Sequence, residues 1–212
     1  MVSKQGEENT MRWEALADDA TVDRVAEVLV KRGIEVFVVS DGAEAKRKVL
    51  DLIPQGSEVM EASSTTMKEI GVTTEIEESG RYDSVRKRLY GITDSEERNN
   101  MRRKSLGTPY AIGSVQAITE GGQLVSASAS GSQISMYAFD SQNVILVVST
   151  NKIVKDLDEA LERIYGYALP LESRRVHEAY GWESSYVGKV LILERDRPGR
   201  TKVILVKEKL GF

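Results

Sequence analysis

Apolar residues in the first quarter of the chain recur at two different spacings. Between Thr21 and Gly33 they are spaced as on one face of a helix, and these two residues supply its start and stop signals. The segment 34–39 is a continuous, mostly β-branched apolar run, which is typical of a strand buried on both faces. A second helix is expected over 41–53, followed by a short strand over 57–62. This β-α-β order favours a parallel sheet with helices on its faces.

The alternation of strands and helices returns in the second half of the chain. Two apolar segments, 109–118 and 123–129, flank a turn whose second glycine suits a positive φ. The fully apolar stretch 143–149 predicts a strand at the centre of the sheet. Asp156 then starts a long amphipathic helix.

The last two apolar segments, 187–195 and 201–208, surround the turn sequence Asp-Arg-Pro-Gly. Such a turn joins antiparallel neighbours, so we expect a C-terminal β-hairpin. The whole pattern predicts an α/β protein with a doubly wound, mostly parallel sheet, flanking helices and this hairpin.

The stretch 73–107 is the least core-like part of the chain. Its charged pairs and few apolar residues indicate helices over one edge of the sheet, with a capping box beginning at Thr74. Its basic segment 98–104 fits either a solvated helix end or the anion-binding edge of a pocket. The chain's 212 residues suit one domain. We therefore expect an N-terminal extension over 1–20 and one domain over 21–212, with a helical insertion at about 73–107.

Composition narrows the chemistry of any site. The formal net charge of −4 argues against a general affinity for nucleic acid. No apolar run is long enough for a membrane span, and the first residues lack the apolar stretch of a signal peptide, so a cytoplasmic protein is expected. With no cysteine and one histidine, His177, the sequence predicts no disulfide, thiolate-bound cluster, zinc site or other cofactor. Catalysis would rest on carboxylates, hydroxyls or lysines.

Four sequence blocks share their order and spacing with a known family. They are SSTTMKEIG at 63–71, GSVQAITEGGQLV at 113–125, SGSQIS at 130–135 and NVILVVSTNKIVKDLDEAL at 143–161. Together they resemble the LUD (lactate-utilisation) domain family. The resemblance implies the fold of ribose-5-phosphate isomerases, glucosamine-6-phosphate deaminases and coenzyme A transferases. Relatives with a named role belong to an iron–sulfur lactate-oxidising system, and some carry a cysteine-rich C-terminal segment that this chain lacks.

Two loops carry the first candidate site residues. Ser63, Ser64, Thr65 and Thr66 offer hydroxyls and helix-start N–H groups that suit a phosphate or carboxylate, and simple helix capping is the alternative. Glu120 lies in a turn with Gly121 and Gly122, where little bulk surrounds its carboxylate. The resemblance implies a nucleophile or base at such a position, and a solvent-exposed turn glutamate is the alternative.

Two further segments complete the predicted site. Ser130, Gly131, Ser132 and Gln133 open a helix and present amides that suit ligand contact or capping alone. Lys152 follows an apolar strand at its carboxyl end, where ligands bind in open α/β sheets. It is expected to pair with a phosphate or carboxylate, or else to be a solvated lysine.

The leading hypothesis is a protein that binds a small anionic metabolite: a hydroxy or keto acid, a sugar phosphate or a coenzyme A ester. The competing hypothesis is a non-catalytic accessory subunit that acts through partner redox subunits in a lactate-oxidising complex. A homo-oligomer is the other expected assembly, and finding it alone would count against that hypothesis. Transferase or isomerase chemistry through Glu120 is a third hypothesis, and the sequence leaves open whether the protein is an enzyme.

Overall fold

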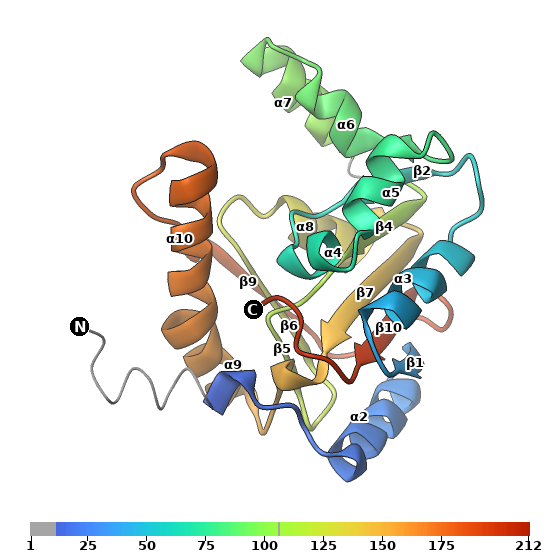
Figure 1. The fold of residues 1–212 in the computed structure, drawn as a ribbon, viewed down its shortest axis with the longest axis vertical. Coiled ribbons are helices and arrows are strands. Elements are labelled where there is room, and N and C mark those ends of the chain that lie inside the picture. The colour runs from blue at the N-terminus through green and yellow to red at the C-terminus, as the bar shows by residue number, and fades with distance from the viewer. Residues whose placement is uncertain (1–11, 106) are drawn as a thin grey trace.

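A parallel sheet forms the centre of the fold. The computed structural model describes residues 12–105 and 107–212, and within them the strands form one sheet of six strands and another of four (Figure 1). All neighbouring strands of the larger sheet are parallel. Their spatial order is β1 (Glu35–Val39), β10 (Thr201–Val206), β7 (Asn143–Ser149), β4 (Tyr110–Gly113), β2 (Glu58–Glu61), β3 (Asp83–Ser84). The predicted α/β class with a mostly parallel, doubly wound sheet is confirmed.

The two inner strands β10 and β7 are buried on both faces. In β10, Val203 and Leu205 pack into one apolar cluster while Ile204 and Val206 pack into another. Successive side chains of a strand point to opposite faces, so a continuous apolar run suits a strand with a core on each side.

Helices cover both faces of the larger sheet. On one face pack α3 (Gly42–Asp51), α4 (Thr65–Glu69) and α5 (Val72–Glu78). The other face packs against the smaller sheet and three helical segments, α2 (Asp19–Lys31), α6 (Val85–Tyr90) and the π-helical η1 (Met136–Asp140). Asp41 caps α3, as the sequence predicts.

The smaller sheet forms an additional layer. Its order is β8 (Ile153–Val154), β5 (Ala117–Thr119), β6 (Leu124–Ser128), β9 (Lys189–Leu193). Strands β5 and β6 form the expected antiparallel pair, and Gly122 in their turn has a φ of 81°. The outer face packs against α9 (Leu157–Arg163), which Asp156 caps, and against η3 (Ile164–Ala168). The long helix α10 (Leu169–Tyr180) continues from there.

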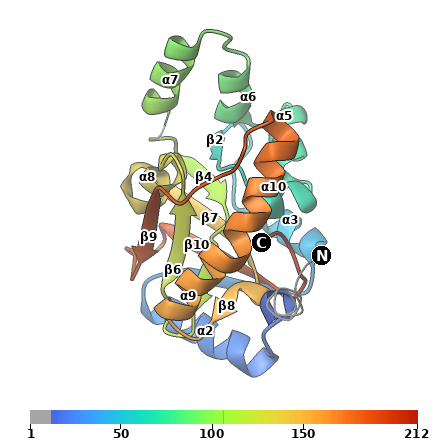
Figure 2. The ribbon, with the colours of Figure 1, turned by 90° about the vertical axis from the view of Figure 1, so that its left-hand side faces the viewer.

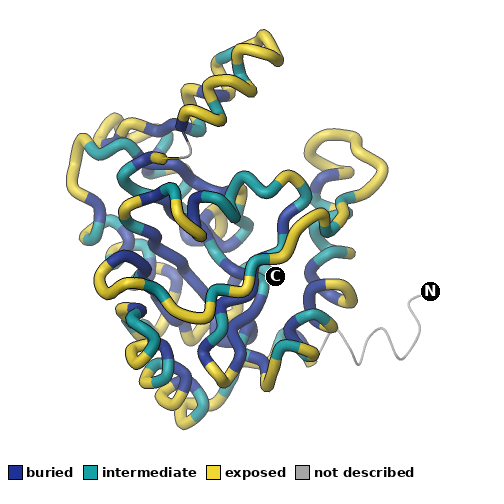
Figure 3. Tube along the Cα trace, turned by 180° about the vertical axis from the view of Figure 1, so that it is seen from behind, coloured by how far each residue is buried: buried dark blue, intermediate teal, exposed yellow. Residues whose placement is uncertain are grey.

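One helix of the segment 73–107 extends away from the body of the fold. Helix α7 (Ser95–Lys104) projects beyond the sheet in two perpendicular views (Figures 1 and 2). Its residues are exposed or half-buried, in contrast to the buried strands of the sheet (Figure 3). It therefore contributes little to the core.

The predicted C-terminal hairpin is wrong. Strand β9 pairs antiparallel with β6 in the smaller sheet, whereas β10 lies between β1 and β7 in the larger one. Their burial explains the separation: β10 is almost wholly buried, while β9 is an edge strand with exposed side chains. The Asp-Arg-Pro-Gly segment therefore connects two sheets.

Three local predictions also need correction. Strand β1 is at the sheet edge, and Val38 is 40% exposed, so it is not buried on both faces. Helix α2 is capped by Asp18, whose side chain accepts from the backbone N–H of Thr21. Helix α5 begins after Gly71, so Thr74 lies inside the helix and forms no capping box.

Gly33 lies in the short connection between α2 and β1, where its backbone packs against that of Asp196. Its φ is +84°, and an added Cβ would overlap the carbonyl oxygen of Asp196. We expect Gly33→Ala to lower the free energy of unfolding by about 3 kcal/mol or more, through backbone strain plus the clash. Gly56→Ala is the control: its φ is +81° with no atom within 4 Å, so only about 1 kcal/mol is expected. Equal losses in urea denaturation would contradict this prediction.

Candidate functional site

A cavity of about 690 Å³ opens at the carboxyl ends of the adjacent strands β2, β4 and β7. Glu61 ends β2, Ser114 follows β4, and Lys152 follows β7 through the short 3₁₀ turn η2 (Thr150–Lys152); all three side chains line the cavity. This is the edge at which open parallel sheets bind ligands.

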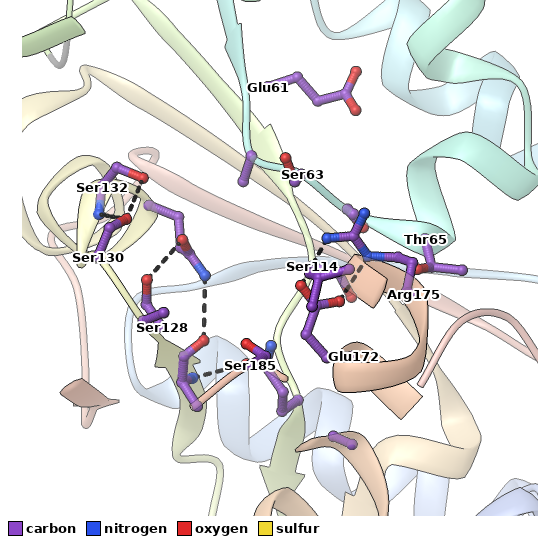
Figure 4. A pocket seen from close by; sticks show the side chains of 18 of the residues that line it. Glu61, Ser63, Thr65, Ser114, Ser128, Ser130, Ser132, Glu172, Arg175 and Ser185 are labelled. Carbon is purple, nitrogen blue, oxygen red and sulfur yellow. Dashed lines mark hydrogen bonds and ion pairs between the residues drawn. The ribbon is translucent and has the colours of Figure 1, made fainter. Parts of the chain in front are cut away.

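The loop after β2 lines one wall of the cavity. Ser63, Ser64, Thr65 and Thr66 all contribute to the lining. Ser64 also caps α4, because its hydroxyl accepts from the backbone N–H of Met67 at 3.3 Å. Ser63 is exposed and its side chain lies close to the strand end (Figure 4).

Lys152 is buried, with 1% of its surface exposed. Its Nζ donates to the hydroxyls of Thr66 (3.1 Å) and Ser114 (3.2 Å), and within the described residues it forms no ion pair. Burial, reinforced by the nearby positive charge of Arg163, lowers the pKa of Lys152 to about 7. An anion in the cavity would oppose this effect and favour the charged amine.

Arg163, the last residue of α9, is a second buried cation near Lys152. Its Nη1 donates to the carbonyl of Gln116 at 2.6 Å, whereas Nε and Nη2 have no hydrogen-bond partner among the described residues. The guanidinium lies 5.1 Å from the ring centroid of Tyr167. Burial lowers the pKa of Arg163 to about 10.

Arg200 shows how this fold satisfies a buried guanidinium that has a structural role. Its three nitrogens donate to the carbonyls of Met136, Tyr137 and Ser141 and to the carboxylate of Asp196, at 2.7 to 2.9 Å. Arg163 has one such acceptor and no carboxylate partner within the described part of the chain. Neither Lys152 nor Arg163 therefore has an ion-pair partner in the described part of the chain, although the charge of Glu69 acts to raise the pKa of Lys152.

Glu61 places a buried carboxylate in the cavity wall. Its Oε1 accepts from Thr73 (2.7 Å) and Arg86 (3.0 Å), while Oε2 has no partner among the described residues. Burial raises the pKa of Glu61 to about 7, although the charge of Arg86 acts in the opposite direction. The group can exchange a proton near neutral pH.

The segment before α8 (Ser132–Ser135) forms another wall. Ser130, Ser132 and Gln133 line the cavity. The Gln133 amide bonds to Ser128 (3.0 Å) and to the carbonyl of Ala127 (3.2 Å), which fixes it against β6. In Figure 4 these serines lie across the cavity from the Glu172–Arg175 ion pair of α10.

The structure brings most of the sequence-predicted residues to one cavity. Eight of them line it: Ser63, Ser64, Thr65, Thr66, Ser130, Ser132, Gln133, Lys152. Gly131 does not line it; its φ of 90° turns the chain into α8 beside the Lys189 side chain.

The turn of Glu120, Gly121 and Gly122 lies outside this cavity. The Glu120 side chain is 46% exposed and forms an ion pair with Arg24 at 3.3 Å. Gly122 packs against α2, where an added Cβ would meet Val28. The structure thus places Glu120 apart from the lysine and hydroxyl groups with which the sequence grouped it.

Comparisons with known proteins settle the family. The model of the LUD domain matches residues 22–206, which is most of the chain. The chain belongs to the LUD domain family. Among solved structures, a DUF162 family protein from Deinococcus radiodurans is similar, with a TM-score of 0.56 at 12% identity over 91% of this chain and 99% of that one. At this identity the similarity concerns the fold.

More distant comparisons add little to the LUD assignment. The structure of eIF2B delta from Chaetomium thermophilum aligns with a TM-score of 0.37 at 12% identity, covering 68% of this chain and 58% of that one. No curated protein matches the sequence. Across residues 12–105 and 107–212, no helix is long and apolar enough to cross a membrane, and no three acidic or histidine side chains form a metal-binding group.

Several residues of this LUD cavity were not predicted from the sequence. Glu61 and Arg175 line it, and Arg163 is buried near Lys152; all three are charged residues in ordinary strand and helix contexts. A signal existed for Arg163, because it is adjacent to the buried residues Ala160 and Ile164 on the apolar side of its helix. A charged residue at such a position indicates either a structural ion pair or a site.

Proposed function

We propose that this LUD-domain protein binds a small anionic metabolite in the cavity, with its acidic group next to Lys152. The observation that carries the proposal is the pairing of Lys152 with hydroxyls alone, above a second buried cation that also has no carboxylate among the described residues. Buried charges are normally paired, so the site favours an anion that supplies the missing charge.

The chemistry of the walls supports the same class of ligand. Hydroxyls of Ser63, Thr65 and Ser114 line the cavity, Ser114 next to the lysine, and can donate to a carboxylate or phosphate. Hydroxy and keto acids, sugar phosphates and coenzyme A esters all carry such a group. The family's name points first to hydroxy acids of the lactate type. Glu120 is not part of the proposed site because it does not line the cavity.

A thermal-shift series with lactate, pyruvate, ribose 5-phosphate and inorganic phosphate tests the proposal. An anion at about 100 times its dissociation constant adds about 2.7 kcal/mol of stability, which raises Tm by about 5–10 °C in a chain of this size. Ser63→Ala should weaken binding about fivefold, the effect of one hydrogen bond. Glu120→Gln, outside the cavity, should bind as the wild type does. The proposal fails if no anion exceeds chloride at equal ionic strength.

A further inference from the structure

The cavity is much larger than a small acid requires. Even at the roughly 30 Å³ that one water takes in the liquid, the six non-hydrogen atoms of a three-carbon hydroxy acid fill only about 180 Å³. The cavity holds about 690 Å³ and extends from Lys152 to residues of α7 and of the loop after α10. The outer part is therefore available to a larger portion of the ligand.

Aromatic rings gather at the outer end. Tyr90 at the end of α6, Tyr180 at the end of α10, and Trp182 and Tyr186 beyond it all line the cavity. Their exposed fractions are between 48% and 65%, whereas the chain's other tryptophan, Trp13, is 3% exposed. Half-exposed rings that share one cavity offer flat faces for a planar group.

The rings are held close together. Tyr180 and Trp182 have their ring centroids 5.3 Å apart. Burial acts to raise the pKa of Tyr180, but hydrogen bonds from Tyr90 and Arg175 outweigh this effect and lower the pKa. These contacts join α6 to α10, so Tyr90, Tyr180 and Trp182 form one cluster across the cavity mouth.

Uncompensated positive charge lies beside this cluster. Of the arginines that line the cavity, Arg86 and Arg175 are paired with carboxylates. Arg98 and Arg102 line the cavity one helical turn apart on α7 and form no ion pair among the described residues. Because α7 buries no residue in the core, packing does not explain its position. Arg98 also donates to the carbonyl of Ile92 at 3.4 Å. The mouth thus combines stacking faces with guanidinium groups that lack a carboxylate partner, and such groups bind phosphate oxygens well.

We infer that the ligand is a nucleotide derivative: its base stacks in the Tyr180–Trp182 cluster, its phosphates bind Arg98 and Arg102, and its acidic far end reaches Lys152. This inference extends the proposed function, and it rests on that function only for the contact between the acidic group of the ligand and Lys152. A polyanion without a planar ring would leave the aromatic cluster unused. A planar ring without phosphates would leave the two arginines unpaired.

Titration with ADP, followed by calorimetry and by the fluorescence of Trp182, tests the inference. We expect ADP to bind and to quench the fluorescence, and adenosine and ribose 5-phosphate each to bind at least tenfold more weakly. Adenosine lacks the phosphates that bind the arginines, and ribose 5-phosphate lacks the base that stacks on the rings. In Trp182→Phe, calorimetric binding should persist while the fluorescence change disappears.

Neighbouring arginines on α7 provide the matched control. Arg102→Gln should lower ADP affinity about tenfold, whereas Arg103→Gln, which removes an exposed cation outside the cavity, should not. Equal losses in the two variants, or no binding of ADP, overturn the inference.

If inorganic phosphate still stabilises the protein through Lys152 while ADP does not bind, the proposed function stands and the nucleotide inference fails. If ADP binds through Arg102 but no small anion stabilises the protein, the inference holds for the mouth and the proposed inner site fails. Tighter binding of a single-stranded RNA than of ADP would also overturn it.

Discussion

Lys152→Met is expected to weaken the binding of inorganic phosphate or a small carboxylate by about 10- to 100-fold. The side chain keeps its length but loses the amine, and a hydrogen bond to a charged group contributes about 1.5–3 kcal/mol. Calorimetry at pH 6 measures the loss. Lys155→Met is the control, because the Lys155 side chain is 81% exposed and lies outside the cavity. Unchanged affinity in Lys152→Met would remove Lys152 from the site.

The same pair of proteins should differ in the pH dependence of binding. The pKa of Lys152 is about 7 in the folded protein, so above pH 7 an anion must bind together with a proton. Wild-type affinity should then fall by up to tenfold for each pH unit above 7 through Lys152, and Lys152→Met should keep only the smaller fall caused by ionisation of Glu61, whose pKa is also about 7. A wild-type affinity that stays constant from pH 6 to 9 would contradict this assignment.

Stability gives an independent measurement of the same group. The pKa of Lys152 is lowered from 10.5 to about 7 on folding, so between these values the unfolded chain binds the extra proton. Burial of Lys152 is therefore most costly below pH 7, and the cost disappears as the pH rises toward 10.5. The wild type should gain stability relative to Lys152→Met by at most about 1.4 kcal/mol per pH unit across this window.

The largest loss of stability is expected for Arg200→Met, about 3–5 kcal/mol. The substitution removes donors to three buried carbonyls and leaves the carboxylate of Asp196 without its ion pair. Chemical denaturation at pH 7 measures the change. Arg197→Met removes a neighbouring exposed arginine and should change stability by no more than about 0.5 kcal/mol. Losses of equal size would show that the buried network has little energetic weight.

The sequence predicted the elements of the fold better than their partners. Asn143–Ser149 was recognised as a central strand because its apolar residues are continuous. Thr201–Val206 has the same continuous apolar residues and is also a central strand. The preceding Asp-Arg-Pro-Gly turn predicted a hairpin there instead. The residues of a turn indicate that the chain changes direction there. They do not determine which strand pairs with which, because that depends on the apolar surfaces that remain to be buried.

The lining of the cavity was predictable where a loop follows a strand. Ser63 to Thr66 and Lys152 were expected to lie together because the carboxyl ends of parallel strands meet at one edge, and they line one cavity. Glu120 was grouped with them although its hairpin extends the smaller sheet and directs it elsewhere. The burial of Glu61 and Arg163 depends on packing between distant segments, which residue type and spacing alone do not determine.

The place of β10 in the sheet has a consequence for how the protein is made. The strand separates β1 from β7, although it follows β1 by more than half of the chain. During synthesis, β1 leaves the ribosome long before the strand that pairs with it, and β7 also precedes that strand. The facing edges remain unpaired until β10 arrives, so the edge of β1 is open to wrong strand pairing for most of translation, and the edge of β7 for its last quarter.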